Sequence, residues 1–436
     1  MTIRWQRLTT GWSTGWRPHL LLFTLALALR AAWVLIVQRN GLGFNDALMY
    51  HGTAENILRG DGFVLPFGDG PTAQWPPGYT LVLAGTYKVF GVSQQAAELV
   101  NAVLGALTVV VLMVAVERIV NRTTAIVAGV FLAVLPGPIL WTEVLVSETL
   151  FTLLVALMLL ALTYASPDWR WGLLFGVVIG TSAMVRGEAL TWFLFPVVAL
   201  WGTVSKVDLA KRVGLVVVAA AVVMAPWTIR NAVEFGEFLP VGANAGRTLW
   251  SGHHPDATGG QTYPTSEDYV RLGVDGEDAT EIEISDAFRD DGIEFLLNNP
   301  RRELELIPLK LIHLNRGDSY AFDWINADPD PAVSAINVER VGTIADFGYF
   351  ALLTLTLLGA AMLGRSFWSK PACRCIAVGF LMLLFLYGFV YYGNYRYRLP
   401  YEPLMVVVAS TLLVRMWQRV RDPDPEISDR PEPAGR

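Results

Sequence analysis

The runs LLVALMLLAL at residues 153–162 and VVVLMVAV at residues 109–116 decide the fold class of this chain. Apolar residues fill both runs, without the alternation of apolar and polar residues that membrane β-barrel strands show. A helix crosses the roughly 30 Å hydrocarbon layer with about 20 mostly apolar residues, and its backbone polar groups are all bonded internally. Both runs are therefore predicted to lie in membrane-spanning helices.

The composition of the whole chain agrees with this prediction. Of its 436 residues, 53% are apolar and 17% are charged, and the mean hydropathy is +0.42. The net charge is −6 and no basic tract with interleaved aromatic residues occurs, so we expect no nucleic-acid partner. We predict an all-α polytopic membrane protein with about ten transmembrane helices. Their predicted positions are 20–37, 99–116, 124–140, 147–165, 171–186, 189–204, 213–229, 346–363, 376–392 and 400–417.

Basic residues predict the orientation of these helices. With a cytoplasmic N-terminus, the short loops that carry Lys and Arg all fall on the cytoplasmic side, as the positive-inside rule requires. The C-terminus is then cytoplasmic too, and the long polar segments are external. We expect Pro300 and Pro308 to break the helical runs of the external cap. The predicted division is an N-terminal transmembrane catalytic module (1–230, with the first external loop at 38–98), an external cap of loops and helices (231–345), C-terminal transmembrane helices (346–418) and a disordered cytoplasmic tail (419–436).

Ionisable residues gather at the external side, which is where chemistry is expected, because such groups are unfavourable inside a bilayer. In FNDALMYHGTAENILRGDGF (44–63), Asp46 and Tyr50 lie on one face of a helix predicted at 46–59. Asp46 is either a functional carboxylate or the N-cap of that helix. Glu143 and Glu148 form a pair of carboxylates near the next external turn. This pair is either functional or serves only to cap a helix end and to contact water.

Two further stretches carry candidate ligand-binding groups. YGNYRYRLPYEP (392–403) contains Tyr395, Arg396 and Arg398, whose positive charges lie outside and favour an anionic ligand over a simple interfacial anchor. Arg230 and Asn231 end another predicted span, and His253 follows in a glycine-rich stretch, although two adjacent histidines are weak grounds for a metal site. For Arg30, closest to mid-membrane, pairing with a carboxylate is favoured over contact with substrate.

The chain resembles a known enzyme family in motifs that follow one another in order. These are AENILRGDGF (54–63), WPPGYTLVLAGTYKVFG (75–91), SETLF (147–151), RGEAL (186–190), PWTIRN (226–231) and YRYRLPYEP (395–403). Together they are similar to the polyprenyl-phosphate-dependent glycosyltransferases of the type C fold. The resemblance is to the bacterial branch, which is similar to protein O-mannosyltransferases and to the aminoarabinose transferase of lipid A.

The resemblance implies the activity and the partners. It implies an inverting hexosyl- or pentosyltransferase that moves sugar from a polyprenyl-phosphate donor to a hydroxyl acceptor at the external face of the bacterial cytoplasmic membrane. The acceptor is a protein, a glycan or a lipid, and the lipid bilayer is the remaining partner. The resemblance also implies roles for candidate residues: Asp46 and Glu148 are catalytic, Arg186, Arg396 and Arg398 bind the donor phosphate, and we assign substrate binding to Tyr50, Glu143, Tyr395, Arg230, Asn231 and His253.

One departure from the family pattern bears on metal dependence. Gln74 and Trp75 precede the two prolines, where related enzymes carry an acid and a lysine. We assign no metal ligand, and dependence on a divalent metal stays open. The alternative functions are a transporter or flippase of lipid-linked sugars, which needs binding groups at mid-membrane, and a non-catalytic envelope scaffold. The sequence does not identify the sugar, the acceptor or the oligomeric state.

Overall fold

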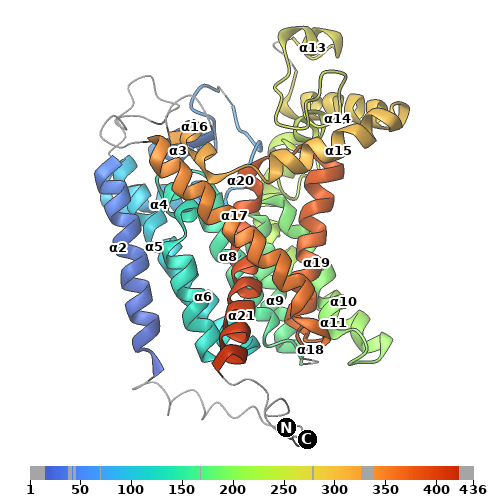
Figure 1. Cartoon of the computed structure of the whole chain (residues 1–436). Coiled ribbons are helices and arrows are strands. Elements are labelled where there is room, and N and C mark those ends of the chain that lie inside the picture. Colours follow the sequence, from blue (N-terminus) through green and yellow to red (C-terminus); the bar gives the residue numbers. More distant parts are fainter. Residues whose placement is uncertain are drawn as a thin grey trace, which may run out of the picture.

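The computed structural model describes residues 15–37, 42, 46–68, 70–166, 168–276, 279–325 and 338–421, and every element below belongs to these residues. Their regular structure is helical, apart from one isolated bridge between Val64 and Pro71. The helices form an upright bundle with shorter helices and loops at one end, which we call the cap end (Figure 1). The predicted tail beyond Arg421 and parts of the predicted loops at 38–45 and 326–337 lie outside the described residues.

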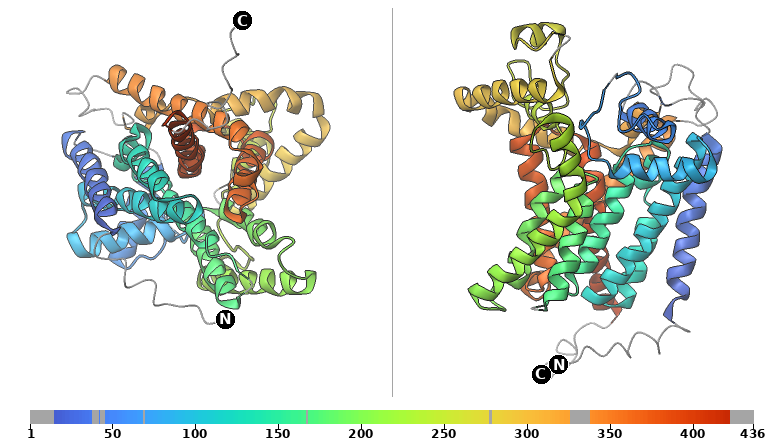
Figure 2. Two further views of the ribbon diagram at one scale, coloured as in Figure 1. Left: turned by 60° about the horizontal axis from the view of Figure 1, so that its bottom comes forward. Right: turned by 180° about the vertical axis from the view of Figure 1, so that it is seen from behind.

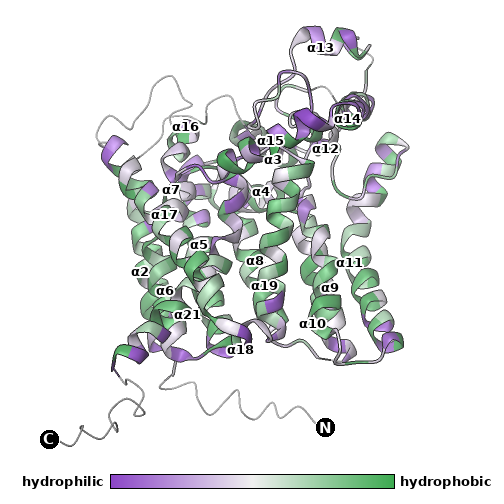
Figure 3. Cartoon of the chain, turned by 45° about the vertical axis from the view of Figure 1, so that its right-hand side comes forward, coloured by the Kyte–Doolittle hydropathy of each residue, from purple (hydrophilic) through white to green (hydrophobic). Residues whose placement is uncertain are grey.

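The elements of the bundle follow the predicted apolar segments, and apolar residues run along the length of these helices (Figure 3). They are α2 (Arg17–Val37), α5 (Gln94–Ile119), α6 (Arg122–Val134), α7 (Pro136–Leu140), α8 (Glu148–Leu162), α9 (Trp169–Ala183), η3 (Gly187–Phe193), α10 (Leu194–Leu200), α11 (Lys206–Phe235), α17 (Val338–Met362), α18 (Gly364–Trp368), α19 (Pro371–Phe385), the π-helix η6 (Leu386–Val390) and α21 (Glu402–Arg421). The protein is a multi-pass membrane protein.

The predicted count of ten spans is not confirmed. In the described part of the chain, 6 helices are long and apolar enough to cross a membrane, or 7 if the bent pair of α6 with the segment Pro136–Glu143 is one span. The predicted segments 147–165 and 189–204 instead contain shorter apolar helices, α8 and η3 with α10. The apolar pattern predicted the positions of these two segments correctly. The helices that form there are shorter than the roughly 20 residues that a full membrane crossing requires.

Arg30 on α2 is buried at the break between α6 and α7, where the chain bends by 52°. Pro136 has no N–H to donate to the Leu132 carbonyl, so the last turn of α6 has unpaired acceptors. The Arg30 guanidinium donates to the carbonyl oxygens of Leu132 and Ala133, each at 3.3 Å. No carboxylate of the described residues pairs with Arg30, so the expected carboxylate partner is wrong, and a helix end with its negative dipole takes that place.

The last helix, α21, is the centre of the bundle. Of the most apolar 18-residue stretch within Tyr395–Arg421, 83% is buried inside the protein. The corresponding stretches of α2, α11 and α17 are each 28% buried. Other helices surround α21 in the view along the bundle (Figure 2). The short elements α20 (Tyr395–Arg398) and η7 (Leu399–Tyr401) precede α21. Their side chains are therefore held inside the protein at the cap end.

Helices α9 and α11 pack closely because glycines face the partner helix. Gly172, Gly176 and Gly180 recur every four residues on α9 and so share one face. A Cβ added at Gly180 would lie 2.8 Å from the Ala220 carbonyl oxygen, and one at Gly176 would overlap the backbone of α11. Small residues at this spacing let two membrane helices approach closely.

The cap end is built from two groups of elements. The predicted helix 46–59 is confirmed as α3 (Asp46–Arg59), and α4 (Gly78–Phe90) follows it; α4 lies across the bundle end rather than along it (Figure 2). The second group is the cap: α12 (Ala245–Trp250), α13 (Ser266–Arg271), α14 (Glu281–Asn298), α15 (Pro300–Leu314), η4 (Asp318–Tyr320) and α16 (Ala321–Ile325). Pro300 begins α15 as predicted, but Pro308 lies inside α15 and does not end it, so that expectation is wrong. The division into modules stays a prediction.

Replacement of Gly176 by Leu is expected to force α9 away from α11. Overpacking of a well-packed interface lowers the free energy of unfolding by about 1–3 kcal/mol. Gly214→Leu on α11 is the control, because no atom lies within 4 Å of a Cβ added there. Thermal unfolding in detergent micelles measures the effect, and equal melting temperatures for the two variants would contradict the close packing.

Candidate active site

Asp46 is the first residue of α3 and stands at the cap end of the bundle. The buried face of α3 carries small residues and Tyr50. The Tyr50 ring packs against the rings of Trp75 and Tyr79, each at a centroid distance of 5.3 Å. Because positions four apart share a helix face, this packing fixes the direction in which the first turn of α3 presents the Asp46 carboxylate.

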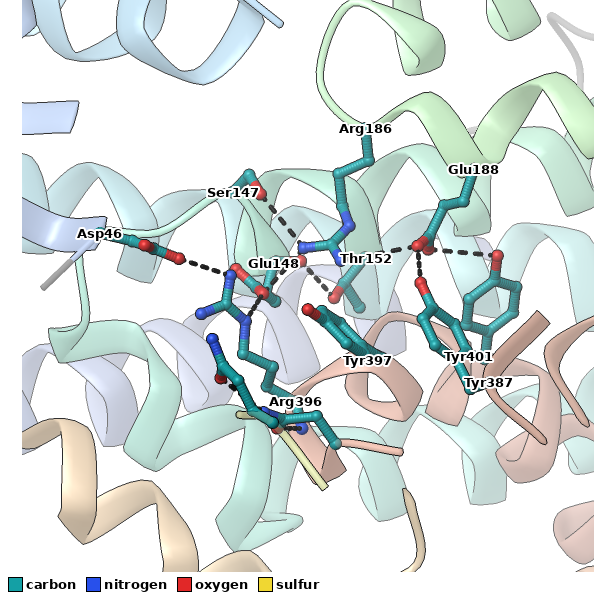
Figure 4. Close-up of polar contacts among 12 residues, drawn as sticks. Asp46, Ser147, Glu148, Thr152, Arg186, Glu188, Tyr387, Arg396, Tyr397 and Tyr401 are labelled. Atoms are coloured by element: carbon teal, nitrogen blue, oxygen red, sulfur yellow. Dashed lines mark hydrogen bonds and ion pairs between the residues drawn. The ribbon is translucent and has the colours of Figure 1, made fainter. Parts of the chain in front are cut away.

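Arg396 on α20 brings two carboxylates from distant segments together (Figure 4). The Asn394 side chain accepts a hydrogen bond from the Arg396 backbone N–H at 3.1 Å and caps α20. The Arg396 guanidinium donates through Nη2 to Asp46 Oδ2 at 2.8 Å and through Nε to Glu148 Oε1 at 2.7 Å. These are charge-assisted hydrogen bonds, stronger than bonds between neutral groups.

Glu148 is the acceptor that two arginines share. It begins α8 and its side chain is 0% exposed. Arg186, which follows α9, donates through Nη1 to Glu148 Oε1 at 2.8 Å and to the Ser147 hydroxyl at 3.3 Å. The positive end of the α8 dipole adds to the two guanidinium charges in favouring a carboxylate at this position.

Glu188, to which we assigned no role from the sequence, is held by two tyrosines and an arginine (Figure 4). Glu188 Oε2 lies 3.5 Å from Arg186 Nη2, and Tyr401 donates its hydroxyl to Glu188 Oε1 at 3.3 Å. Tyr387 donates a further hydrogen bond to Glu188 Oε2. The sequence signal for this contact is the tyrosine-rich run at 387–401, whose hydroxyls need buried acceptors.

Asp46, Arg186, Glu188 and Arg396 border a cavity of about 430 Å³ at the cap end, whereas Glu148 lies behind its lining. The bundle contributes carboxylates, guanidinium groups and tyrosine rings, and the cap contributes Arg247 and the segment 261–264. Residues that line it include Asp46, Tyr50, Gln74, Trp75, Ser147, Arg186, Glu188, Asn244, Arg247, Thr248, Ser251, Gln261, Thr262, Tyr263, Tyr387, Tyr391, Tyr392, Arg396 and Tyr397. The lining is polar and aromatic, with few convergent charges, as is typical of a ligand site.

Arg398 does not lie with Arg396 and does not line the cavity. Its guanidinium donates to Asp318 Oδ1 at 2.6 Å, forms an ion pair with Glu402 and covers the ring of Tyr349. Residues two apart on a helix point about 200° apart, so neighbouring arginines of α20 face opposite ways. The structure thus places Arg398 in a separate buried cluster that joins η4 to α21, away from the position expected for a phosphate ligand.

The other expected substrate contacts, apart from Tyr50, also lie outside the cavity lining. Glu143 is buried in the turn before α8, and Tyr395 donates its hydroxyl to the Tyr320 carbonyl at 2.6 Å. Arg230 donates to the Thr72 carbonyl at 2.8 Å, and Asn231 donates to the Leu239 carbonyl at 2.9 Å. These contacts connect loops and helix ends around the cavity.

His253 is fully buried in the cap, and its position argues against direct contact with a ligand in the cavity. Its Nδ1 lies 2.9 Å from Glu303 Oε2, and its Nε2 lies 2.9 Å from the Val390 carbonyl oxygen. Lys310 Nζ is 3.2 Å from the same Nε2, and burial lowers the pKa of Lys310 to about 8. This cluster joins α15 to the end of η6.

Within the described part of the chain, no group of three or more His, Cys, Asp or Glu side chains could hold a metal ion. The carboxylates of Asp46 and Glu148 do not fit a divalent cation between them. The Arg396 guanidinium occupies that position with hydrogen bonds of 2.8 and 2.7 Å, and it would repel a cation at this range.

Comparisons with known proteins bear on the fold of the chain. The family model described as "Dolichyl-phosphate-mannose-protein mannosyltransferase" matches residues 74–229. The structure of the Archaeoglobus fulgidus oligosaccharyltransferase in complex with Zn and sulfate is similar with a TM-score of 0.54 and 15% identity, over 93% of this chain and 49% of that one. Archaeal AglB from the same organism, in complex with an inhibitory peptide and a dolichol-phosphate, gives 0.51 and 13%, over 92% and 51%.

The fold is the type C glycosyltransferase fold. The chain spans about half the length of these archaeal enzymes. ArnT from Cupriavidus metallidurans bound to undecaprenyl phosphate also matches, with a TM-score of 0.46 and 16% identity over 97% of this chain and 82% of that one. No curated protein matches the chain.

The resemblance inferred from the sequence motifs is confirmed by the matched family segment and the fold.

Glu148→Gln is expected to destabilise the protein, because two buried arginines lose the carboxylate they share. Removal of one partner of a buried ion pair lowers the free energy of unfolding by about 3–5 kcal/mol. The control is Glu117→Gln at the other end of the bundle, whose side chain is 39% exposed and lies 3.7 Å from His19. The Glu117 carboxylate is exposed to water, and a pair with an exposed partner contributes about 1 kcal/mol or less. Chemical unfolding in mixed micelles compares the two, and a similar loss for both variants would contradict the central role of Glu148.

Proposed function

We propose that this protein transfers a sugar from a polyprenyl-phosphate donor to a hydroxyl acceptor in the cap-end cavity. The observation that carries the proposal is the Asp46 carboxylate, which lines the cavity with its side chain 30% exposed while a buried arginine fixes its direction. A carboxylate that is both accessible and held in place is suited to take a proton from a bound hydroxyl.

The acceptor hydroxyl attacks the anomeric carbon of the donor sugar while Asp46 takes its proton. The bond between that carbon and the phosphate oxygen breaks, and the polyprenyl phosphate leaves with the bonding electron pair. A single displacement of this kind inverts the configuration at the anomeric carbon. Asp46 acts as a base here and not as a nucleophile.

The arginines of the cavity serve the leaving group. As the glycosidic bond lengthens, negative charge grows on the phosphate, so fixed donors stabilise the transition state more than the ground state. Arg396 uses Nε and Nη2 for its two carboxylates. A guanidinium has five N–H donors, so donors beyond those two contacts serve the phosphate.

A lipid-linked donor reaches only a cavity that lies next to the membrane. The distribution of charged residues supports an external position for this cavity. The cap end is placed outside because Lys and Arg of the connecting loops gather at the opposite end of the bundle, where the positive-inside rule places the cytoplasm. We place the protein in the bacterial cytoplasmic membrane, with both termini in the cytoplasm. Among the basic residues of that end are Arg118, Arg122, Lys206, Lys211, Arg365, Lys370 and Arg419.

The cap is proposed to select the acceptor. Segment 231–345 supplies one wall of the cavity through residues between 241 and 251 and through 261–264, whereas module 1–230 supplies Asp46 and Arg186. The acceptor is a protein, a glycan or a lipid, and each offers the hydroxyl that the reaction consumes. The alternative of a transporter needs binding groups at mid-membrane. The charged groups that line this cavity lie at the cap end instead.

Asp46→Asn is expected to reduce transfer by about 10²–10⁴-fold, because the proton of the acceptor loses its base. The partly exposed side chain makes a large loss of stability unexpected. The matched control is Glu55→Gln on the same helix, where the carboxylate pairs with Arg59 at 2.9 Å and does not line the cavity.

The measurement is mass spectrometry of the purified protein with a panel of polyprenyl-phosphate sugars, following free polyprenyl phosphate and transferred sugar. We expect the wild type and Glu55→Gln to consume one donor at similar rates, and Asp46→Asn to consume it at least about a hundredfold more slowly. Near-normal transfer by Asp46→Asn would remove Asp46 from the mechanism.

A further inference from the structure

The two arginines in the centre of the site carry no net positive charge to a ligand. Arg186 and Arg396 are surrounded by three carboxylates, those of Asp46, Glu148 and Glu188, at distances of 2.7–3.5 Å. The cluster is therefore negative by one charge as long as all five groups are ionised. An anionic phosphate is therefore bound more favourably where a further cation in the cavity adds to the hydrogen bonds from these two arginines.

Arg247 on α12 is the cavity-lining cation that has no such partner. Its guanidinium makes no hydrogen bond or ion pair with any described residue, and its Nε atom is buried. The side chain is partly buried and lines the cavity. A buried donor without a partner is unfavourable, so this guanidinium is placed for a group that the described residues do not supply.

The neighbours of Arg247 show that one whole face of α12 is turned to the cavity. Asn244, Arg247, Thr248 and Ser251 all line it, and their spacing of three, four and seven residues puts them on one helix face. This face therefore presents polar groups around the guanidinium, as a site for an oxygen-rich ligand requires.

The position of α12 is fixed from behind. Trp250 stacks on His254 at 4.2 Å, and its Nε1 donates to Asp291 on α14 at 2.8 Å. Gly246 packs against the Ser285 backbone so closely that a side chain would not fit. Arg247 is thus presented by a rigid element, which suits a binding residue better than a mobile loop does.

The arginines on the three neighbouring cap helices argue against a chance exposure of Arg247. On α13, α14 and α15, each arginine has a carboxylate partner: Arg271 with Asp291 and Asp268, Arg289 with Asp286 and Asp290, and Arg301 and Arg302 with Glu305. Arg247 differs from all four, although the same cap is rich in acidic residues.

We propose that Arg247 binds the phosphate group of the lipid-linked donor in the cavity. The inference rests on the proposed function for the identity of the donor. It differs from the sequence prediction, which assigned the phosphate to Arg186, Arg396 and Arg398, because here the cap also supplies a charge for the phosphate. A planar guanidinium binds two phosphate oxygens side by side, a geometry that Lys cannot reproduce.

Binding of undecaprenyl phosphate, without a sugar, to the purified full-length protein tests the proposal by native mass spectrometry in detergent. Arg247→Gln is expected to weaken binding at least tenfold, and Arg247→Lys to weaken it less. Arg301→Gln is the matched control, because its side chain is 94% exposed on the cap and does not line the cavity; its binding should stay within twofold of wild type. Unchanged melting temperatures would show that the variants fold.

Competition by inorganic phosphate separates a lipid-linked ligand from free phosphate. Inorganic phosphate should displace the lipid only at far higher concentration, with or without Arg247. Binding by Arg247→Gln within twofold of wild type overturns the proposal, and so does a loss that affects inorganic phosphate alone. Arg247-dependent lipid binding without any sugar transfer would keep this inference and refute the proposed function, whereas a wild type that binds no undecaprenyl phosphate would refute both.

Discussion

The guanidinium of Arg396, buried between the carboxylates of Asp46 and Glu148, is the interaction on which the rest of the site depends. A charge removed from water is strongly unfavourable unless it is paired and hydrogen-bonded. Each of the three partners starts or belongs to a helix of its own, so their contact fixes how α3, α8 and α20 meet. The same contact that orders the cap end also aims the Asp46 carboxylate into the cavity.

Much of this arrangement could be predicted from the sequence. Asp46, Glu148, Arg186 and Arg396 were all assigned to the site from their motifs, and the structure brings the four side chains together. Helix α3 has the predicted bounds, because its polar start and small buried residues are local features. What the sequence could not separate is Arg396 from Arg398, since a short helical turn between two irregular segments gives no reliable phase.

The missed features are long-range contacts. Glu188 contacts Tyr387 and Tyr401, which belong to a distant part of the sequence. Nothing in the spacing of these residues along the chain indicates that they lie side by side. Arg30 was expected to pair with a carboxylate, yet it binds carbonyl oxygens that Pro136 leaves without a donor in the neighbouring helix. Arg247 is a single arginine in a polar segment, so the sequence gives no indication that it binds a ligand. Its significance comes from the partner that it lacks in the folded protein.

The type C fold explains why these contacts gather at one end of the bundle. Buried α21 carries the arginines of α20 to the cap end, and the loops before α8 and after α9 bring Glu148 and Arg186 there. This chain has about half the length of the archaeal oligosaccharyltransferases that share its fold. The cap segment between α11 and α17 contributes part of the cavity lining.

Product formation in proteoliposomes of known orientation tests the account most directly. The donor is placed in one leaflet, the acceptor in the compartment that faces the cap end, and the new glycosidic bond is detected by mass spectrometry. The account predicts product only when donor phosphate and acceptor are both on the cap side, with release of free polyprenyl phosphate. Movement of the labelled lipid between leaflets without a new glycosidic bond would contradict it and would favour a transporter.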